Sequence, residues 1–211
     1  MPLQKIIHFA NGGKIALWQL TETTEALLKQ VNDTAIWQYI QQRASHPLRH
    51  QQMLASQLMA KHLSQNPKEN IYHNDKNKPL LRISDAHISL SHSEKYVAAF
   101  YHEAKNISID LEKIAEKALH LHPRFLNPTE YNLLLQNNNL VENACIFWSA
   151  KEAVFKYFGG AYVDFKEQFC INSFTQKNNK GYLKMRVDDK YDVFVAFKKN
   201  KLFVITYVLL F

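Results

Sequence analysis

Hydrophobic and polar residues repeat with two different periods along the chain. Between residues 48 and 63 the apolar positions recur every three or four residues, which predicts a helix. Between residues 107 and 112 apolar and polar residues alternate, which predicts a strand with one buried face. Both patterns occur in each half of the sequence, so the chain is predicted to pair helices with strands throughout.

Further helices are predicted at 21–31, 33–44, 113–121, from Asn127 onward and at 142–158. The other predicted strands are 6–10, 14–20, 80–83, a strand that begins at His87, 96–101, 182–187, 191–197 and 202–210. We expect Ser91-His92-Ser93 to form a polar turn, and the stretch of low periodicity after Gly159-Gly160 to form a loop.

The composition is that of a folded protein with one large domain or two small ones. Of the 211 residues, 46% are hydrophobic and 12% are aromatic, which excludes a disordered chain. The first five residues lack the layout of a signal peptide, and the longest apolar run, 203–211, is too short to span a membrane. Cys145 and Cys170 do not make a disulfide framework, so we expect a soluble, cytoplasmic protein.

The formal net charge of +7 is spread over both halves of the chain. A diffuse positive field suits an acidic partner or a polyphosphate. Nucleic acid is the less favoured partner, because no basic cluster, zinc-ligand spacing or aromatic RNA-binding signature accompanies the charge.

The predicted helix 142–158 carries charged and aromatic residues at helical spacing. Trp148, Glu152 and Lys156 are four residues apart and fall in line on one face, while Lys151 lies about 100° round the helix and is expected to reach the same cleft from the side. A surface ion pair between Glu152 and Lys156 explains this spacing equally well when the helix is considered alone.

The predicted strand 107–112 places Asp110 and Glu112 on the same side. Two carboxylates roughly 7 Å apart repel each other unless a cation lies near them, and a site made only of oxygen ligands selects a hard ion such as Mg²⁺. The solvated face of an edge strand is the alternative explanation for the same two residues.

Together the two stretches resemble a known family. I-S-I-D-L-E, followed about forty residues later by F-W-S-A-K-E-A-V-F-K, is similar to the signature of the 4′-phosphopantetheinyl transferases, in particular the monomeric surfactin-type group. The resemblance implies transfer of 4′-phosphopantetheine from coenzyme A to a serine of an acidic apo carrier protein. It further implies that the reaction depends on Mg²⁺ and releases adenosine 3′,5′-bisphosphate.

The resemblance also implies roles for individual residues. Asp110, Glu112 and Glu152 match the Mg²⁺ ligands, and Glu152 and Lys156 match the catalytic residues, with Glu152 or a metal-bound water as the base. The residues implied to bind coenzyme A are Lys151, Ser91, His92, Lys78 and Arg49. Ser108 and Gln57 depart from the pattern, since the family usually has Gly and often has Arg at these positions.

The implied fold is α/β, with two similar subdomains in a pseudo-twofold arrangement. Each subdomain, 1–105 and 106–211, would pair helices with an antiparallel sheet, and coenzyme A would bind in the cleft between them. A monomer is implied, without nucleic acid or membrane partners. Two alternatives stay open: another Mg²⁺-dependent phosphotransferase that uses the same carboxylates, and a non-catalytic module that binds acidic partners.

Overall fold

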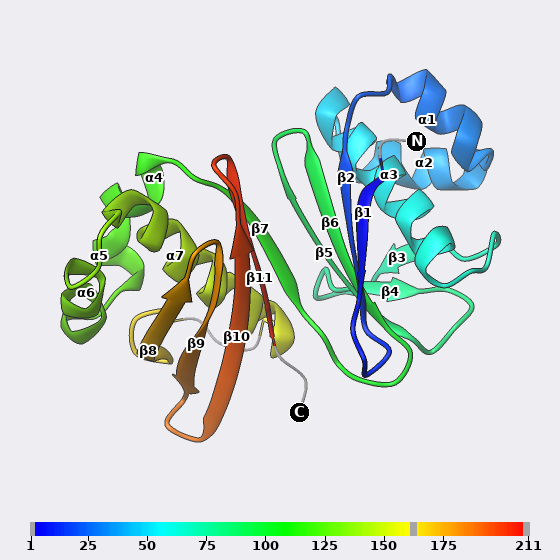
Figure 1. Cartoon of the computed structure of the whole chain (residues 1–211). Helices are drawn as coiled ribbons and strands as arrows, with labels where there is room; N and C mark the ends of the chain where they lie inside the picture. Colours follow the sequence, from blue (N-terminus) through cyan, green and yellow to red (C-terminus); the bar gives the residue numbers. More distant parts are fainter. Residues whose placement is uncertain (1–2, 161–163, 209–211) are drawn as a thin grey trace. The chain divides into compact units, whose positions relative to one another are not determined.

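The chain divides into two compact units, Met1–Ile107 and Ser108–Phe211. A computed structural model describes residues 3–160 and 164–208. In each unit, helices pack on one face of an antiparallel sheet, which confirms the predicted mixed α/β class (Figure 1). The pseudo-twofold relation of the units remains a prediction.

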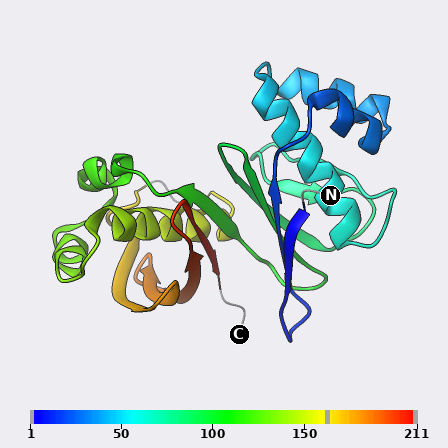
Figure 2. The same ribbon diagram turned by 45° about the horizontal axis from the view of Figure 1, so that its top comes forward.

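The first unit is built on a four-stranded sheet in the order β1-β2-β6-β5. Three helices, coloured blue to cyan in Figure 2, lie on the same side of this sheet, and a two-stranded sheet of β3 and β4 completes the unit. The strands are β1 (Leu3–His8), β2 (Lys14–Gln19), β3 (Ile71–His73), β4 (Pro79–Leu81), β5 (His87–Ser93) and β6 (Tyr96–His102), and the helices are α1 (Thr24–Val31), α2 (Thr34–Arg43) and α3 (Pro47–Leu63).

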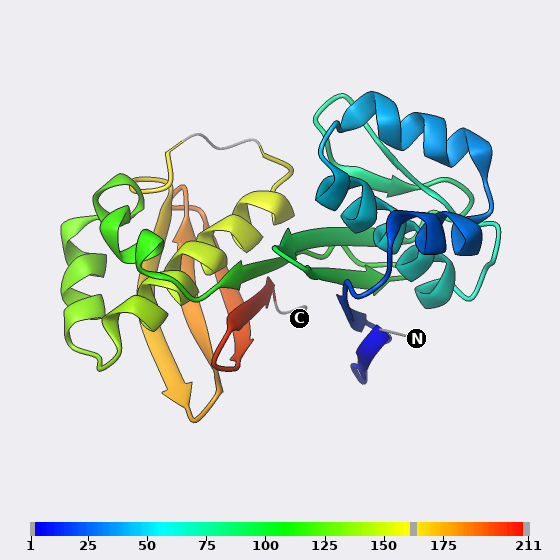
Figure 3. The same ribbon diagram turned by 90° about the horizontal axis from the view of Figure 1, so that it is seen from above.

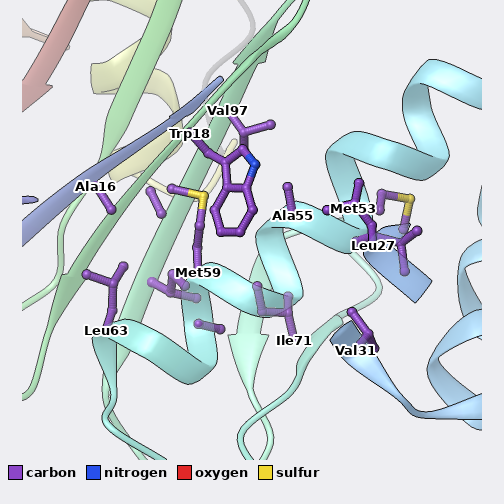
Figure 4. Close-up of a cluster of buried hydrophobic side chains, with 14 of the residues drawn as sticks. Ala16, Trp18, Leu27, Val31, Met53, Ala55, Met59, Leu63, Ile71 and Val97 are labelled. Carbon is purple, nitrogen blue, oxygen red and sulfur yellow. The ribbon is translucent and has the colours of Figure 1, made fainter. Parts of the chain in front are cut away.

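Helix α3 contributes much of the core of this unit. Met59 and Leu63 of α3 belong to the same buried cluster as Trp18 of β2 and Ile71 of β3 (Figure 4). Gln57, at the position where the family often has Arg, is buried as well. Its side-chain amide donates to the carbonyl of Ile71 at 2.9 Å and accepts from the N–H of Ile71 at 2.7 Å, so it fixes β3 to α3.

The second unit is built on a five-stranded sheet in the order β7-β11-β10-β9-β8. Helix α7 lies across one face of this sheet, and the shorter helices α4, α5 and α6 pack beside it (Figure 3). The strands are β7 (Ile109–Lys113), β8 (Phe169–Lys177), β9 (Lys180–Val187), β10 (Tyr191–Lys199) and β11 (Phe203–Val208), and the helices are α4 (Glu116–His120), α5 (His122–Phe125), α6 (Pro128–Leu135) and α7 (Leu140–Tyr157).

Most predicted elements are confirmed, and two strands are additional. The expected loop after Gly160 is wrong in part, because β8 (Phe169–Lys177) lies within it. A register shift between Ile171 and Ser173 interrupts the alternation of buried and exposed residues along β8, so the sequence pattern is obscured. The second addition, β3, has only three residues. Positions 209 and 210 of the predicted last strand lie outside the described residues.

Two smaller predictions are corrected. Ser91, His92 and Ser93 are the last residues of β5 and pair with β6, so the turn consists of Glu94 and Lys95 instead. The helix predicted at 113–121 is shorter, because Lys113 belongs to β7.

Both cysteines are free thiols. In the part of the chain that the structure describes, no helix has the length and apolar character needed to cross a membrane.

Candidate functional site

Helix α7 packs on the five-stranded sheet through one face, and a second stripe of its residues faces β7, the edge strand of that sheet. Ile146, Phe147, Ala150 and Val154 are fully buried in the core of the second unit, which fixes the rotation of the helix. The stripe that contains Trp148, Glu152 and Lys156 then faces the acidic residues of β7.

The acidic strand residues each receive a hydrogen bond from α7. Trp148 Nε1 donates to Glu112 Oε1 at 3.0 Å, and Ser149 Oγ donates to Asp110 Oδ2 at 2.8 Å. Lys156 Nζ lies 2.6 Å from Asp110 Oδ1 and forms an ion pair with it. The predicted strand and helix therefore meet at these residues, although they are far apart in the sequence.

The carboxylates of this group influence one another. Burial and the negative charge of Asp110 raise the pKa of Glu152 to about 7, although Lys156 opposes this shift. Burial and Asp110 also raise the pKa of Glu112, which is partly offset by the hydrogen bond from Trp148. Three acidic groups thus share a region with the ammonium group of Lys156, and the charge of Lys117 also acts on Glu112. At neutral pH Glu152 is poised between its two protonation states.

The donor set suits Mg²⁺, because it consists of carboxylate oxygens whose mutual repulsion a divalent cation would relieve. Within residues 3–160 and 164–208, however, no three Asp, Glu, His or Cys side chains are grouped closely enough to hold a metal ion as they stand. Both oxygens of Asp110 contact other side chains, those of Ser149 and Lys156. Coordination by Asp110, Glu112 and Glu152 therefore remains a prediction.

Lys151 does not reach this group, and the expectation that it shares a cleft with Glu152 is corrected. Its side chain is fully buried on another side of α7. Nζ donates to the carbonyl oxygens of Phe125 at 2.6 Å and Phe165 at 2.7 Å, and it lies 2.7 and 2.8 Å from the two carboxylate oxygens of Glu130. An ammonium enclosed in this way is not available to a phosphate group.

The other residues predicted to bind coenzyme A belong to the first unit. Ser91 is buried and His92 is exposed, at the end of β5. Arg49, near the start of α3, donates to Gln52 Oε1 at 3.3 Å, and Gln52 Nε2 donates to the carbonyl of Glu94 in the β5–β6 turn at 2.9 Å. Arg49 is thereby linked to the turn that follows the Ser-His-Ser sequence.

Lys78 lies near the opposite end of β5. Its Nζ donates to Asn106 Oδ1 at 3.3 Å. Burial of His87, the first residue of β5, lowers the pKa of that histidine most, and the positive charge of Lys78 lowers it further. Lys78 therefore does not share the position of Ser91 and His92.

A basic cluster around His73 was not recognised as a group from the sequence. Burial and the charges of Arg43 and Arg49 lower the pKa of His73 to about 4, so its imidazole is neutral at pH 7. Its Nδ1 is 2.7 Å from the Tyr39 hydroxyl, and Arg43 lies over the Tyr39 ring, 5.6 Å from the centroid. These residues come from α2, α3 and β3, and no spacing along the chain indicates that they meet.

Ser108 stands directly before β7, where the family usually has Gly. It is fully buried, and its carbonyl accepts a hydrogen bond from the N–H of Val208 at 3.3 Å. Its hydroxyl has no hydrogen-bond partner among the described residues. The serine therefore fits the backbone at this position but leaves a buried polar atom unsatisfied.

Comparisons with known proteins agree with this site. Residues 106–208, which contain β7 and α7, match the sequence profile of the 4′-phosphopantetheinyl transferase superfamily. A stretch of 79 residues is 33% identical to the 4′-phosphopantetheinyl transferase Sfp of Bacillus subtilis (strain 168), and it covers 36% of this chain and 35% of that protein. The match thus spans about a third of the relative's length. Through residues 106–208, the chain belongs to the 4′-phosphopantetheinyl transferase superfamily.

Proposed function

We propose that this protein transfers 4′-phosphopantetheine from coenzyme A to a serine hydroxyl of an apo carrier protein, as a transferase of the surfactin type. The proposal depends on one observation above all: α7 and β7 bring Asp110, Glu112, Glu152 and Lys156 together within the region that matches the superfamily. A group of three carboxylates and one ammonium suits transfer between phosphate esters, because that reaction needs charge stabilisation more than covalent chemistry.

In this proposal Asp110, Glu112 and Glu152 hold Mg²⁺. The bound ion would reduce repulsion between the carboxylates and the diphosphate of coenzyme A and would stabilise charge that develops on the transferred phosphoryl group. Trp148 and Ser149 orient Glu112 and Asp110, because each donates a hydrogen bond to one carboxylate oxygen.

Glu152 and Lys156 act on the reacting groups themselves. The serine oxygen of the carrier forms a bond to the phosphorus next to pantetheine, and the bond from that phosphorus to the bridging oxygen breaks, which releases adenosine 3′,5′-bisphosphate. Glu152 accepts the serine proton, directly or through a water molecule. Its pKa of about 7 belongs to the metal-free protein, and a bound cation would lower this pKa and favour the route through water. Lys156 places positive charge beside the phosphates.

Residues of the first unit bind coenzyme A in this proposal. Arg49, Lys78, Ser91 and His92 keep the roles that the resemblance implies, and we omit Lys151 because its ammonium is enclosed. The basic cluster of Arg43, Arg49 and His73 is an additional place for a phosphate group. The net charge of +7 favours an acidic carrier protein as the partner of a monomeric enzyme.

The test is to incubate the protein with coenzyme A, Mg²⁺ and an apo carrier protein and to weigh the carrier by mass spectrometry. We expect the carrier to gain one phosphopantetheine group, and Glu152→Gln to abolish the gain while the fold is retained. Glu167→Gln, which removes an exposed carboxylate of the same unit, serves as the matched control and is expected to remain active.

Two results would contradict the proposal. Transfer from a nucleoside triphosphate in preference to coenzyme A would indicate a different phosphotransferase. Binding of the acidic carrier that needs no Mg²⁺, survives Asp110→Asn and leads to no change in carrier mass would indicate a non-catalytic binding module.

A further inference from the structure

One polar side chain interrupts an apolar row on β11. Val204, Thr206 and Val208 are alternate residues of this strand, and all three are buried, Val204 and Thr206 completely. Valine has nearly the same shape as threonine and would fill this position without a buried hydroxyl group, which needs a hydrogen-bond partner. The partners of the Thr206 hydroxyl therefore indicate why a polar residue is present.

The Thr206 hydroxyl lies next to the carboxylate group described above. Thr206 is directly opposite Asp110 in the pairing of β11 with β7. Its Oγ1 is 2.9 Å from Ser149 Oγ and 2.8 Å from the carbonyl oxygen of Ser149. Because Ser149 Oγ donates to Asp110 Oδ2, residues from β11, α7 and β7 form one buried chain of hydrogen bonds.

The number of protons determines the direction of this chain. An ionised carboxylate can only accept, so the single hydroxyl proton of Ser149 points to Asp110. The single hydroxyl proton of Thr206 must then point to one of the two oxygens of Ser149. When it points to Ser149 Oγ, Thr206 holds the Ser149 side chain in the rotamer that donates to Asp110. When it points to the Ser149 carbonyl oxygen, Thr206 instead fixes the backbone of α7 that carries this side chain.

We propose that Thr206 is a positioning residue for Asp110 that acts through Ser149, an inference that rests on the proposed function. Ser149 fixes Oδ2 of Asp110, and Lys156 contacts Oδ1. Asp110 would be one of the residues that hold Mg²⁺ in the proposed function, so its orientation would affect the affinity for the ion. Groups that orient metal ligands from behind commonly change metal affinity when they are replaced. Thr206 lies 96 residues from Asp110 in the sequence and belongs to neither stretch of the family signature.

The experiment compares Mn²⁺ binding by the parent protein with binding by Thr206→Val and Thr206→Ser. Mn²⁺ replaces Mg²⁺ as the probe, coenzyme A is present at saturation, and free Mn²⁺ is followed by electron paramagnetic resonance. We expect Thr206→Val to weaken Mn²⁺ binding about tenfold, the lower end of the range for such residues. Thr206→Ser keeps the hydroxyl and is expected to bind within about twofold of the parent protein.

The thermal midpoint is measured on the same proteins, because a purely structural role of Thr206 would lower the midpoint of its variants. Thr206→Val leaves no donor unsatisfied, since Ser149 still donates to Asp110, so we expect its thermal midpoint to be unchanged or raised. Val208→Ala is the matched control: it opens a cavity on the same row of β11 and should lower the midpoint without affecting Mn²⁺ binding.

Each contrary result has a distinct meaning. Parent-like Mn²⁺ binding by Thr206→Val would overturn the inference and leave the proposed function intact. Equal weakening by Val208→Ala would show that any disturbance of β11 acts in the same way, and it would overturn the positioning role. No Mn²⁺ binding by the parent protein would remove the proposed metal site, and the inference with it.

Discussion

Helix α7 carries two lysines that each pair with a carboxylate, and the two pairs differ in every other respect. Lys151 and Glu130 are both buried, with side-chain exposures of 0% and 1%. The three protons of the Lys151 ammonium all have acceptors. Lys156 is 29% exposed, and its partner Asp110 lies near two further acids, Glu112 and Glu152.

The comparison separates a pair that holds the fold from a pair suited to chemistry. Glu130 also accepts hydrogen bonds from the backbone N–H groups of Asn127 and Ile171, so the Lys151 pair joins α6, α7 and β8 with every charge compensated. Around Lys156 the carboxylates outnumber the ammonium group, which leaves negative charge for a cation to neutralise. Adjacency in the motif therefore does not mean a shared role.

The largest effect is expected when the buried pair is broken. Lys151→Met leaves the Glu130 carboxylate buried without a counter-ion, which should lower the free energy of unfolding by about 3–5 kcal/mol in urea denaturation. Adding Glu130→Gln removes the second charge and keeps an oxygen for the N–H of Ile171, so the double variant should recover a large part of the loss. Unchanged stability together with weaker coenzyme A binding would instead support a direct role of Lys151 toward the phosphates.

Replacing Lys156, the partly exposed lysine of the two, should lower the transfer rate. Lys156→Ala is expected to lower the transfer rate about a hundred- to a thousandfold, because the proposed function uses its positive charge beside the phosphates. The thermal midpoint should change little, since Glu152 can take up a proton when the ammonium is lost. Lys180→Ala, at an exposed position of β9, is the control. Loss of stability in proportion to loss of rate would mean that the two lysine pairs are not different in kind.

A smaller effect concerns pH. The pKa of Glu152 is about 7 in the folded protein, against an ordinary value of 4.5, because of burial and Asp110. Between these values the unfolded chain has lost a proton that the folded protein keeps, so the free energy of unfolding should fall as pH rises from 4.5 to 7 and then level off. In metal-free buffer this contribution is on the order of 3 kcal/mol.

Glu152→Gln provides the comparison for the pH measurement. The variant has no titrating group at this position, so it should match the parent protein at pH 4.5 and exceed it in stability at pH 8. If the unfolding free energies of the two proteins change with pH in the same way from pH 4.5 to pH 8, Glu152 does not titrate in this range.

The sequence predicted the parts of the site that depend on local periodicity. The alternation around Asp110 and Glu112 and the helical spacing of Trp148, Glu152 and Lys156 both describe the structure, because each property is fixed within one element. Long-range packing determines which residues of other elements contact this strand and this helix, and the local sequence pattern gives no information about those contacts.

The predictions that the structure corrects fail for the same physical reason. The expectation that Lys151 reaches the cleft of Glu152 fails because its ammonium pairs with Glu130, which is twenty-one residues away in α6, and the motif gives no information about that contact. The cluster of Arg43, Arg49 and His73 likewise forms only when α2, α3 and β3 have packed. Strand β8 was missed because a register shift removes the alternation that identifies a strand.

The pairing of β7 with β11 has a consequence for biosynthesis. Strand β7 ends at Lys113 and β11 begins at Phe203, about ninety residues later. At 5–20 residues per second, the ribosome therefore makes β7 roughly 5 to 20 seconds before its partner strand. Throughout that interval the nascent strand exposes unpaired backbone that other chains could join. Its two acidic side chains disfavour such joining, so the carboxylates that the proposed function assigns to the metal site would also protect the chain while it is being made.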